Sequence, residues 1–398
     1  MITFVDYFNF INSFFGLSLY SYDKNKKCFY KSHVKIGYCS TILIITIFVY
    51  PSIINFIVSK ILDISGSHLA ELVSIFQTLS ELALSVSLML YKLLNYNKDI
   101  SCRNNYEKLK EFFDKHSRNG PVSQLNIANR RNILLIISAV LFYIQVLTTV
   151  GVLSRIITSG TEGYYYAACY AFTYSQIALT GNIFFERILQ HKFMISQINR
   201  TLETYLETLT YEIKYRSKAH CEIVSCKMSD DLDKLQELNS SIYSLIAELM
   251  QYESFSMIIV FLQKFIEIII PLFYQFVAQY LYVIQFYNAP QFLIFGVFYI
   301  SCTTASVCLY IGICERMQQE MSTTAKILHE FPVHKTDDRL KESINRFSLQ
   351  ILQEKRPISV CGMFNVDNTL LYSMISSMTS YLILLVQFQL QGVGSSKG

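Results

Sequence analysis

The sequence predicts an all-α, polytopic membrane protein with seven transmembrane helices, and composition is the first observation behind this prediction. Hydrophobic residues make up 52% of the 398 residues and charged residues only 16%, whereas soluble chains carry about 25% charged residues. The mean hydropathy is +0.31. Helices are the expected spanning elements, because an open sheet would leave backbone polar groups unsatisfied in lipid. The net charge of +4 is too small to suggest a nucleic-acid partner.

Seven apolar segments are the second observation. A helix needs about 20 mostly apolar residues to cross a hydrocarbon core of about 30 Å. The segments that meet this requirement are 34–58, 70–94, 132–153, 164–188, 257–282, 292–314 and 366–390. The second and fourth are the least apolar, because they carry Glu71, Glu81 and several hydroxyl groups. The first residues lack the early Lys or Arg of a signal peptide, so a cleaved leader is not expected.

The basic residues predict the orientation of these spans. Segments 1–33, 95–131, 189–256 and 316–365 carry 27 of the 34 Lys and Arg residues. Basic loops stay cytoplasmic, so we expect the N-terminus inside and the C-terminus outside, which is inverted relative to a G-protein-coupled receptor. The expected segments in chain order are cytoplasmic segment 1–33, helices one to four in 34–188, cytoplasmic connection 189–256, helices five and six in 257–314, cytoplasmic segment 315–365, helix seven in 366–390 and outer tail 391–398.

Two apolar stripes predict helical extensions in the cytoplasm. Leu and Ile recur at spacings of three and four within 232–249, with 229–231 as the expected helix start. A second stripe precedes the seventh span and consists of Leu340, Ile344, Phe347 and Ile351. Residues 183–206 predict an extension of the fourth helix. The stripes pack either on one another within the chain or between subunits, and periodicity alone favours the first.

The sequence motifs do not indicate an enzyme. The phosphate loop Gly-x-x-x-x-Gly-Lys, the dinucleotide motif Gly-x-Gly-x-x-Gly and the zinc motif His-Glu-x-x-His are all missing from the sequence. Cys221 and Cys226 lie beside His220, but their spacing is not the Cys-x-x-Cys of zinc sites, which favours free thiols. We therefore expect no catalysis, no cofactor and no metal.

Three ionisable residues lie within the predicted spans, where such residues are costly and often functional. Lys264 and Glu267 are three residues apart, so they can share a helix face and pair. Since both are near the predicted inner end, Lys264 could instead extend to the headgroups. Glu81 is in the middle of the second span, where it serves either as a ligand acceptor or as a protonated group bonded to a neighbour.

Polar and aromatic residues gather on the predicted outer halves of the spans and form a candidate ligand pocket. Tyr166, Tyr170 and Tyr174 repeat every four residues and therefore share one helix face. An aromatic belt at the interface explains Tyr174 less well than a pocket with convergent polar groups does. The candidate pocket residues are Gln77, Glu81, Gln145, Thr149, Tyr166, Tyr170, Tyr174, Gln275, Gln279 and Tyr299.

The last span contains Ser380-Tyr381, five hydrophobic residues and then Gln387-Phe388. Gln387 is one turn from the outer end, where it either reaches the headgroups or, if repeated by symmetry, forms a ring in a pore. The pattern resembles the Thr-Tyr-(five hydrophobic)-Gln-Phe signature of insect gustatory receptors, with Ser in place of Thr. The stretch from Cys361 to Leu371 is similar to the one preceding that signature.

This resemblance implies a homotetrameric, ligand-gated cation channel in the plasma membrane of a sensory neuron. It implies that Gln387 and Phe388 form the outer gate and Ile383 the wall below, with Ser380 and Tyr381 in the same signature. It also implies an outward-facing tastant pocket in 34–188. For the cytoplasmic stripes, it favours contacts between subunits over packing within the chain. The implied partners are a small-molecule tastant, permeating cations, membrane lipid and other gustatory receptor subunits.

The tyrosine-rich pocket favours a bitter compound over a sugar, which would need more carboxylates and amides. Two alternatives remain open. One is an odorant receptor subunit of the same superfamily, which usually works with a common co-receptor. The other is a secondary transporter that uses Lys264, Glu267 and Glu81 as a relay, although the sequence has no visible inverted repeat.

Overall fold

The computed structural model describes residues 10–23, 25–65, 68–116, 121–156, 160–281, 290–354 and 357–395. Within the helices, the side chains of 53–65, 68, 70, 114–116, 121–130, 151–156, 160–167, 278–281, 290–292 and 392–395 are outside the description. The elements in chain order are β1 (Tyr20–Asp23), β2 (Cys28–Lys31), α2 (His33–Ser65), α3 (His68–His116), α4 (Pro121–Ile156), α5 (Gly160–Tyr215), α6 (Lys218–Leu281), α7 (Pro290–Glu330), the 3₁₀ helix η2 (Val333–Lys335), α8 (Asp338–Glu354), β3 (Ser359–Val360), β4 (Phe364–Asn365) and α9 (Asn368–Ser395).

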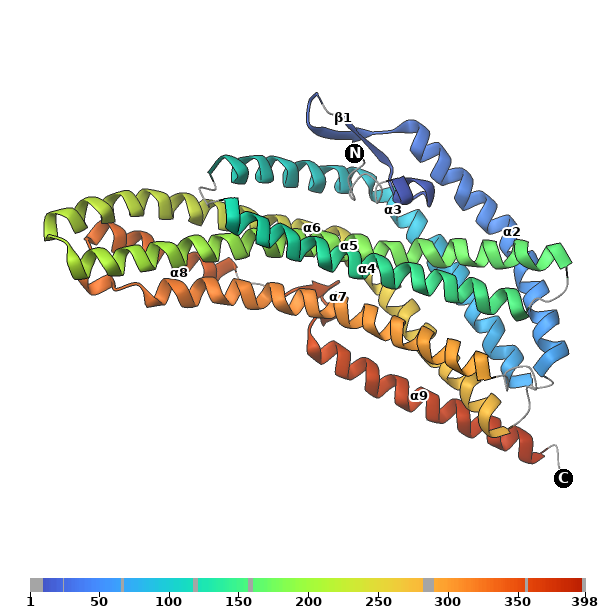
Figure 1. Cartoon of the computed structure of the whole chain (residues 1–398). Helices are drawn as coiled ribbons and strands as arrows, with labels where there is room; N and C mark the ends of the chain where they lie inside the picture. Colours follow the sequence, from blue (N-terminus) through green and yellow to red (C-terminus); the bar gives the residue numbers. More distant parts are fainter. Residues whose placement is uncertain are drawn as a thin grey trace.

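The long helices lie roughly along one axis and form an elongated bundle (Figure 1). The starts of α3 and α5 and the ends of α2 and α9 lie at the right of the view, and we call this the predicted outer end. The turn between α5 and α6 and the short helix α8 lie at the left, which we call the predicted inner end. The all-α prediction is confirmed, and each predicted span falls within one of the long helices, apart from two residues ahead of α9 and residue 282, which is outside the described residues.

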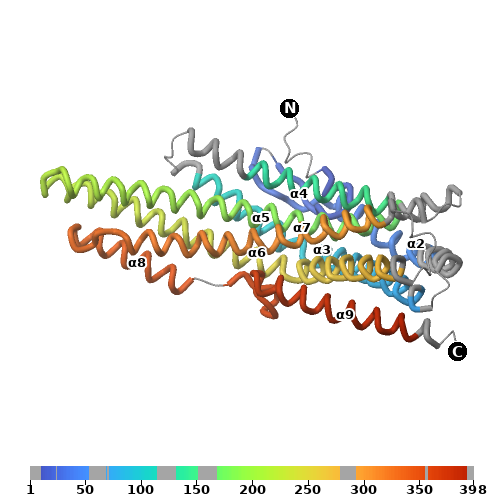
Figure 2. The backbone as a smooth tube through the Cα atoms, turned by 60° about the horizontal axis from the view of Figure 1, so that its bottom comes forward, coloured from blue at the N-terminus to red at the C-terminus, as the bar shows by residue number. Residues whose placement is uncertain are grey.

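Six of the described helices are long and apolar enough to cross a membrane. The exception among the seven predicted spans is the segment 164–188 within α5. This helix packs against α2, α3, α4, α6 and α7, and Figure 2 shows it among these neighbours along the bundle. Its hydroxyl and amide groups face other helices and not lipid, since Ser175, Gln176 and Thr180 are all buried. The low hydropathy of this span therefore reflects its enclosure by protein.

The predicted cytoplasmic extensions are present as continuations of the spans. α6 has 64 residues, so it is about 96 Å long at 1.5 Å per residue, and it joins the 232–249 stripe to the fifth span. The predicted helix start at 229–231 is wrong, because α6 begins at Lys218 and Ser229 lies buried within it. Ser229 bonds the hydroxyl of Ser343 on α8 at 2.8 Å, so its polarity serves a helix contact and not a cap.

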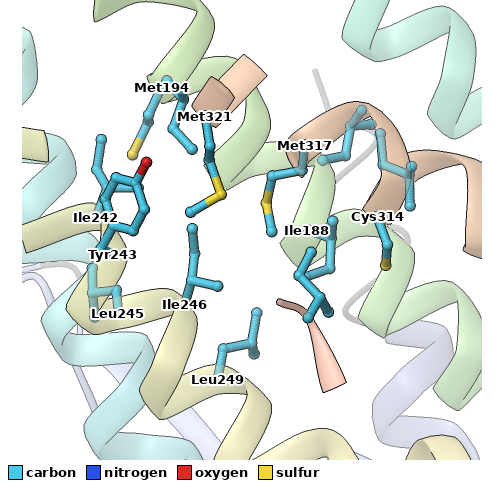
Figure 3. Packing of buried hydrophobic residues seen from close by; sticks show 14 of the residues in the cluster. Ile188, Met194, Ile242, Tyr243, Leu245, Ile246, Leu249, Cys314, Met317 and Met321 are labelled. Atoms are coloured by element: carbon cyan, nitrogen blue, oxygen red, sulfur yellow. The ribbon is translucent and has the colours of Figure 1, made fainter. Parts of the chain in front are cut away.

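The core of the inner half contains both apolar stripes. Leu232 and Ile242 of α6 belong to the same buried cluster as Leu340 and Phe347 of α8. Figure 3 shows the part of this cluster where α5, α6 and α7 interdigitate around a group of methionines. The stripes therefore pack on each other within the chain, which is the first of the two interpretations that the periodicity left open.

Two short hairpins interrupt the helices, and neither was predicted. The first pairs β1 with β2, and the Asn104 side chain of α3 bonds both the N–H and the C=O of Phe29, at 2.7 and 3.0 Å. The second pairs β3 with β4 immediately before α9. Its loop contains Cys361 and Gly362 with φ of +48° and +68°, a region that non-glycine residues seldom adopt. The chain thus changes direction sharply before α9.

Candidate ligand site and pore helix

A buried polar cluster lies where α2, α3 and α5 meet, and Thr173 of α5 is at its centre. The Thr173 hydroxyl lies 3.3 Å from Glu81 Oε1 on α3 and 3.4 Å from the Tyr50 hydroxyl on α2. Tyr50, Glu81 and Thr173 are 1%, 5% and 2% exposed. One turn earlier on α5, Tyr170 accepts a 3.3 Å hydrogen bond from Gln77 Nε2. Four candidate residues on two helices are therefore in one place: Gln77 and Glu81 of α3, and Tyr170 with the adjacent Tyr174 of α5.

The second part of the site is an ion pair on α6. Lys264 Nζ donates to Glu267 Oε2 at 2.9 Å, and the two side chains are 0% and 6% exposed. The prediction that they pair is confirmed, and the burial of Lys264 excludes the alternative in which it reaches the headgroups. The ammonium also lies 5.3 Å from the ring centroid of Tyr174, a distance typical of a cation–π contact.

Tyr299 of α7 completes this part of the site, beside Tyr174 and Glu267. The Tyr174 hydroxyl and Glu267 Oε1 are buried, yet neither makes a well-formed hydrogen bond to a described residue. The Tyr299 hydroxyl is the polar group that faces both of them, and it has one proton to donate, so acceptor lone pairs remain at this point for a further polar group. Tyr174 is 1% exposed, so its ring lies inside the bundle and not in an interfacial belt.

The remaining candidates join α4, α6 and α7. Gln145 of α4 lies 3.2 Å from Ser306 and 3.4 Å from Thr303 on α7. Thr149 bonds the Gln145 carbonyl at 2.8 Å. Gln275 of α6 packs its amide against Gly296 of α7, where an added Cβ would lie 2.0 Å from Gln275 Nε2. The side chains of Tyr166 and Gln279 lie outside the described residues.

Sequence reasoning missed a second polar cluster, nearer the predicted inner end. Arg187 of α5 donates to Glu253 of α6 at 2.8 Å and to Asp99 of α3. Arg103, one turn beyond Asp99, bonds it at 3.1 Å and stacks on the Tyr20 ring at 4.3 Å. The available signal was the occurrence of charged residues at the ends of three predicted spans. The sequence does not show that these charged side chains meet, because they lie on three helices that are far apart along the chain.

His191 adjoins this cluster, one turn beyond Arg187 and past the predicted end of the fourth span. Its Nδ1 lies 2.7 Å from the Arg187 carbonyl oxygen, and the ring is 2% exposed. Burial lowers the pKa of His191 to about 4, so the ring is neutral at physiological pH. Hydrogen bonding to a carbonyl then makes Nδ1 the protonated nitrogen.

The α9 helix has the least buried apolar window among the described spans, at 11%. Met378, Leu382 and Leu385 pack on α6 and α7, and an apolar groove of about 310 Å³ runs between the three helices. At about 100° per residue, the opposite face of α9 carries Ser376, Ser380, Ile383 and Gln387. These residues are all exposed.

The five predicted pore residues therefore divide into two stripes. Ser380 and Gln387 lie directly opposite the packed face of α9, with Ile383 at the edge of the same stripe, where it lines the groove, whereas Tyr381 and Phe388 lie between the two faces. Tyr381 is 56% exposed but already contacts α6 through Phe265. Gln387 and Phe388 are neighbours in sequence, so they cannot point in the same direction from one helix.

Comparison with solved structures identifies the fold. The chain is similar to the insect olfactory receptor OR5 from Machilis hrabei, with a TM-score of 0.62, 14% identity and coverage of 96% of this chain and 97% of that chain. For the same receptor in complex with eugenol, the TM-score is 0.67 and the identity 15%, with the same coverage. The fold is thus that of the insect olfactory receptor OR5.

The sequence comparisons then give the family. The model of the 7tm Chemosensory receptor family matches residues 7–392, and the chain belongs to this family. It is 25% identical to putative gustatory receptor 94a of Drosophila melanogaster over 216 residues, which are 52% of this chain and 53% of that one. It is 36% identical to the gustatory receptor for bitter taste 66a of the same species over 88 residues, 22% of this chain and 17% of that one. The match thus covers about half or less of these relatives.

Proposed function

We propose that this chain is a subunit of a tastant-gated cation channel in which copies of α9 line a central pore. The observation that carries the proposal is the exposed stripe of Ser376, Ser380, Ile383 and Gln387 opposite the packed face of α9. In lipid, a stripe with a carboxamide and several hydroxyl groups is costly. Around a symmetry axis, the same groups face water and passing cations.

The same proposal includes the number of subunits and the contacts between them in the cytoplasmic part. The resemblance to gustatory receptors implies four subunits with the predicted outer end of α9 at the narrowest part. Gln387 then forms a polar ring with Ile383 as the apolar wall below it, and Phe388 and Tyr381 flank the ring from the side. In the cytoplasmic part, α8 leaves Leu349 and Leu352 exposed, at 59% and 76%, and these side chains suit subunit contacts.

The ligand site and the pore helix are connected through α6. Lys264 and Glu267 occupy the face of α6 that meets Tyr174, whereas Phe265 occupies the face that meets Tyr381 of α9. A tastant that fits the arrangement of α6 in the open pore better than in the closed pore shifts the equilibrium towards opening. Without such a difference in affinity, it shifts nothing. We assign the tastant to the bitter class, as the tyrosine-rich lining and the bitter-taste relative suggest.

Whole-cell recording from cells that express this chain alone tests the proposal. We expect cation current evoked by a bitter panel, with permeability ratios that change in Gln387→Ala. Gln389→Ala is the matched control, because this Gln lies on the same helix but is buried, at 4% exposure. Permeability that is unchanged by Gln387→Ala, with current intact, would overturn the placement of the pore.

The same recordings separate the two alternative functions. The fold is shared with an olfactory receptor, so an odorant receptor subunit predicts silence from this chain alone and current only with a partner subunit. A secondary transporter that uses Lys264 and Glu267 predicts flux coupled to protons, which neutral substitutions of both residues abolish. A channel predicts conductance that persists in the same double variant.

A further inference from the structure

The buried site around Glu81 contains more acid than base. Among the described residues at this site, two side chains are acidic, Glu81 and Glu267, and one is basic, Lys264. The ammonium forms its 2.9 Å bond with Glu267. Glu81, on α3, has only neutral hydroxyl groups as hydrogen-bond partners, those of Tyr170 and of Thr173 at 3.3 Å. An isolated buried carboxylate is strongly disfavoured, so Glu81 requires either a proton or a cationic partner.

The surroundings of Glu81 are aromatic on three sides and ionic on the fourth. Tyr50 faces it from α2, Tyr170 from α5, the Lys264–Glu267 pair from α6 and Tyr299 from α7. Tyrosine faces attract cations, and organic ammonium groups are the ligands that aromatic cages with a nearby acid recognise best. A small metal ion would instead require several oxygen ligands at short distance.

Two polar atoms at the same site face the Tyr299 hydroxyl and still have lone pairs to offer a further donor. They are the Tyr174 hydroxyl and Glu267 Oε1, on residues that are 1% and 5% exposed. Both can accept a hydrogen bond from an N–H donor. The site therefore combines an excess carboxyl group, an aromatic lining and unused acceptors, which are the features that a protonated amine would use.

We propose that this site binds an organic ammonium ligand, with Glu81 as the counter-charge and Tyr50, Tyr170 and Tyr174 as the aromatic lining. The inference rests on the proposed ligand-gated function and adds the chemical class of the ligand to it. Binding is ionic and non-covalent. The carboxylate of Glu81 offsets the ligand's charge, and the ligand takes the place of the proton that Glu81 needs when the site is empty.

A matched pair of probes tests the charge requirement on the purified full chain. Phenyltrimethylammonium carries a permanent charge, and tert-butylbenzene is its uncharged counterpart of nearly the same shape. We expect the ammonium probe to raise the thermal unfolding midpoint of the wild-type chain more than the neutral probe does. Equal stabilisation by the two probes, or stabilisation by the neutral probe alone, would overturn the proposal without the need for any variant.

Variants then locate the charge. Glu81→Gln should weaken the apparent affinity for the ammonium probe by at least about tenfold and leave that for the neutral probe unchanged, whereas Glu81→Asp should keep most of the preference. Glu107→Gln on the same helix is the matched control. Loss of the preference in Glu107→Gln as well would count against the site. Stabilisation by Na⁺ over K⁺ that disappears in Glu81→Gln would assign the site to a metal ion and overturn the organic ligand.

These experiments test the ammonium site and the proposed channel independently. Probe binding that depends on Glu81 but evokes no current would support the ammonium site and contradict the proposed channel. Current evoked by uncharged tastants, together with no binding preference for the ammonium probe, would support the channel and contradict the ammonium site.

Discussion

Phe265 of α6 and Tyr381 of α9 meet edge to face, with ring centroids 6.0 Å apart and an interplanar angle of 86°. Lys264, the neighbour of Phe265 in the chain, lies on the other side of α6, over the ring of Tyr174 on α5. Two successive residues of one helix thus contact the candidate ligand site and the proposed pore helix. A small rotation of α6 would change both contacts together.

The Phe265–Tyr381 contact predicts a gating phenotype. Tyr381→Ala removes an edge-to-face pair, whose contribution is about 0.5–1.5 kcal/mol, and should shift the half-maximal tastant concentration by up to about tenfold. Tyr381→Phe keeps the ring and should resemble the wild type. The measurement is the dose–response curve of the evoked current at matched surface expression. Tyr372→Ala, at a 71% exposed position of the same helix, is the control, and an equal shift there would refute a specific role for this contact.

Introduced cysteines on α9 should report its two faces. Cysteine at Ser380 or Gln387 should react with a charged, membrane-impermeant thiol reagent and block current, because both positions belong to the exposed stripe. Cysteine at Leu382 should not, since this side chain packs against the cluster of α6. The background should replace Cys308 and Cys361, the two exposed native thiols. Block at Leu382 with none at Gln387 would mean that α9 presents its other face to the pore.

The Lys264–Glu267 pair predicts a non-additive effect on stability. Lys264→Met leaves the Glu267 carboxyl buried without its partner and should cost roughly 3–5 kcal/mol of unfolding free energy. Lys264→Met with Glu267→Gln removes both charges and should recover most of that loss. Thermal unfolding in detergent, followed by the exposure of buried thiols, measures both. If the losses in Lys264→Met and in Glu267→Gln simply added in the double variant, the pair would not be energetically coupled.

His191 predicts a stability that falls with acidity. Burial lowers the pKa of His191 from 6.5 to about 4, so between these values the unfolded chain takes up a proton that the folded chain refuses. Stability is therefore lost as the pH falls through this window, by about 2 kcal/mol at about pH 5. His191→Gln should have a smaller difference in midpoint between about pH 7.5 and about pH 5. His329→Gln, at an exposed position, should behave as the wild type does, and identical slopes in all three proteins would contradict the assignment.

Local patterns in the sequence were sufficient to predict the helices, but not where each helix starts or which hairpins lie beside them. The 340–351 stripe predicted α8 because spacings of three and four place apolar side chains on one face whatever they pack against. The same periodicity could not find the start of α6, because the buried Ser229 resembles a cap in sequence. The β1–β2 hairpin was missed for a related reason. Its position depends on Asn104, which is far along the chain, and not on its own turn residues.

The sequence by itself determined the class of protein, the positions of the spans and the family signature around Gln387, because hydropathy, helical period and a short motif are all properties of neighbouring residues. Only the tertiary structure decided which charges are buried together. Glu81 and Lys264 lie on different helices, as do Arg187 and Asp99, and no property of either residue alone specifies the contact. It also decided that the polar stripe of α9 lies opposite its packed face. Such arrangements arise from the packing of whole helices, where apolar burial sets the rotation of each helix and polar side chains then find the partners within reach.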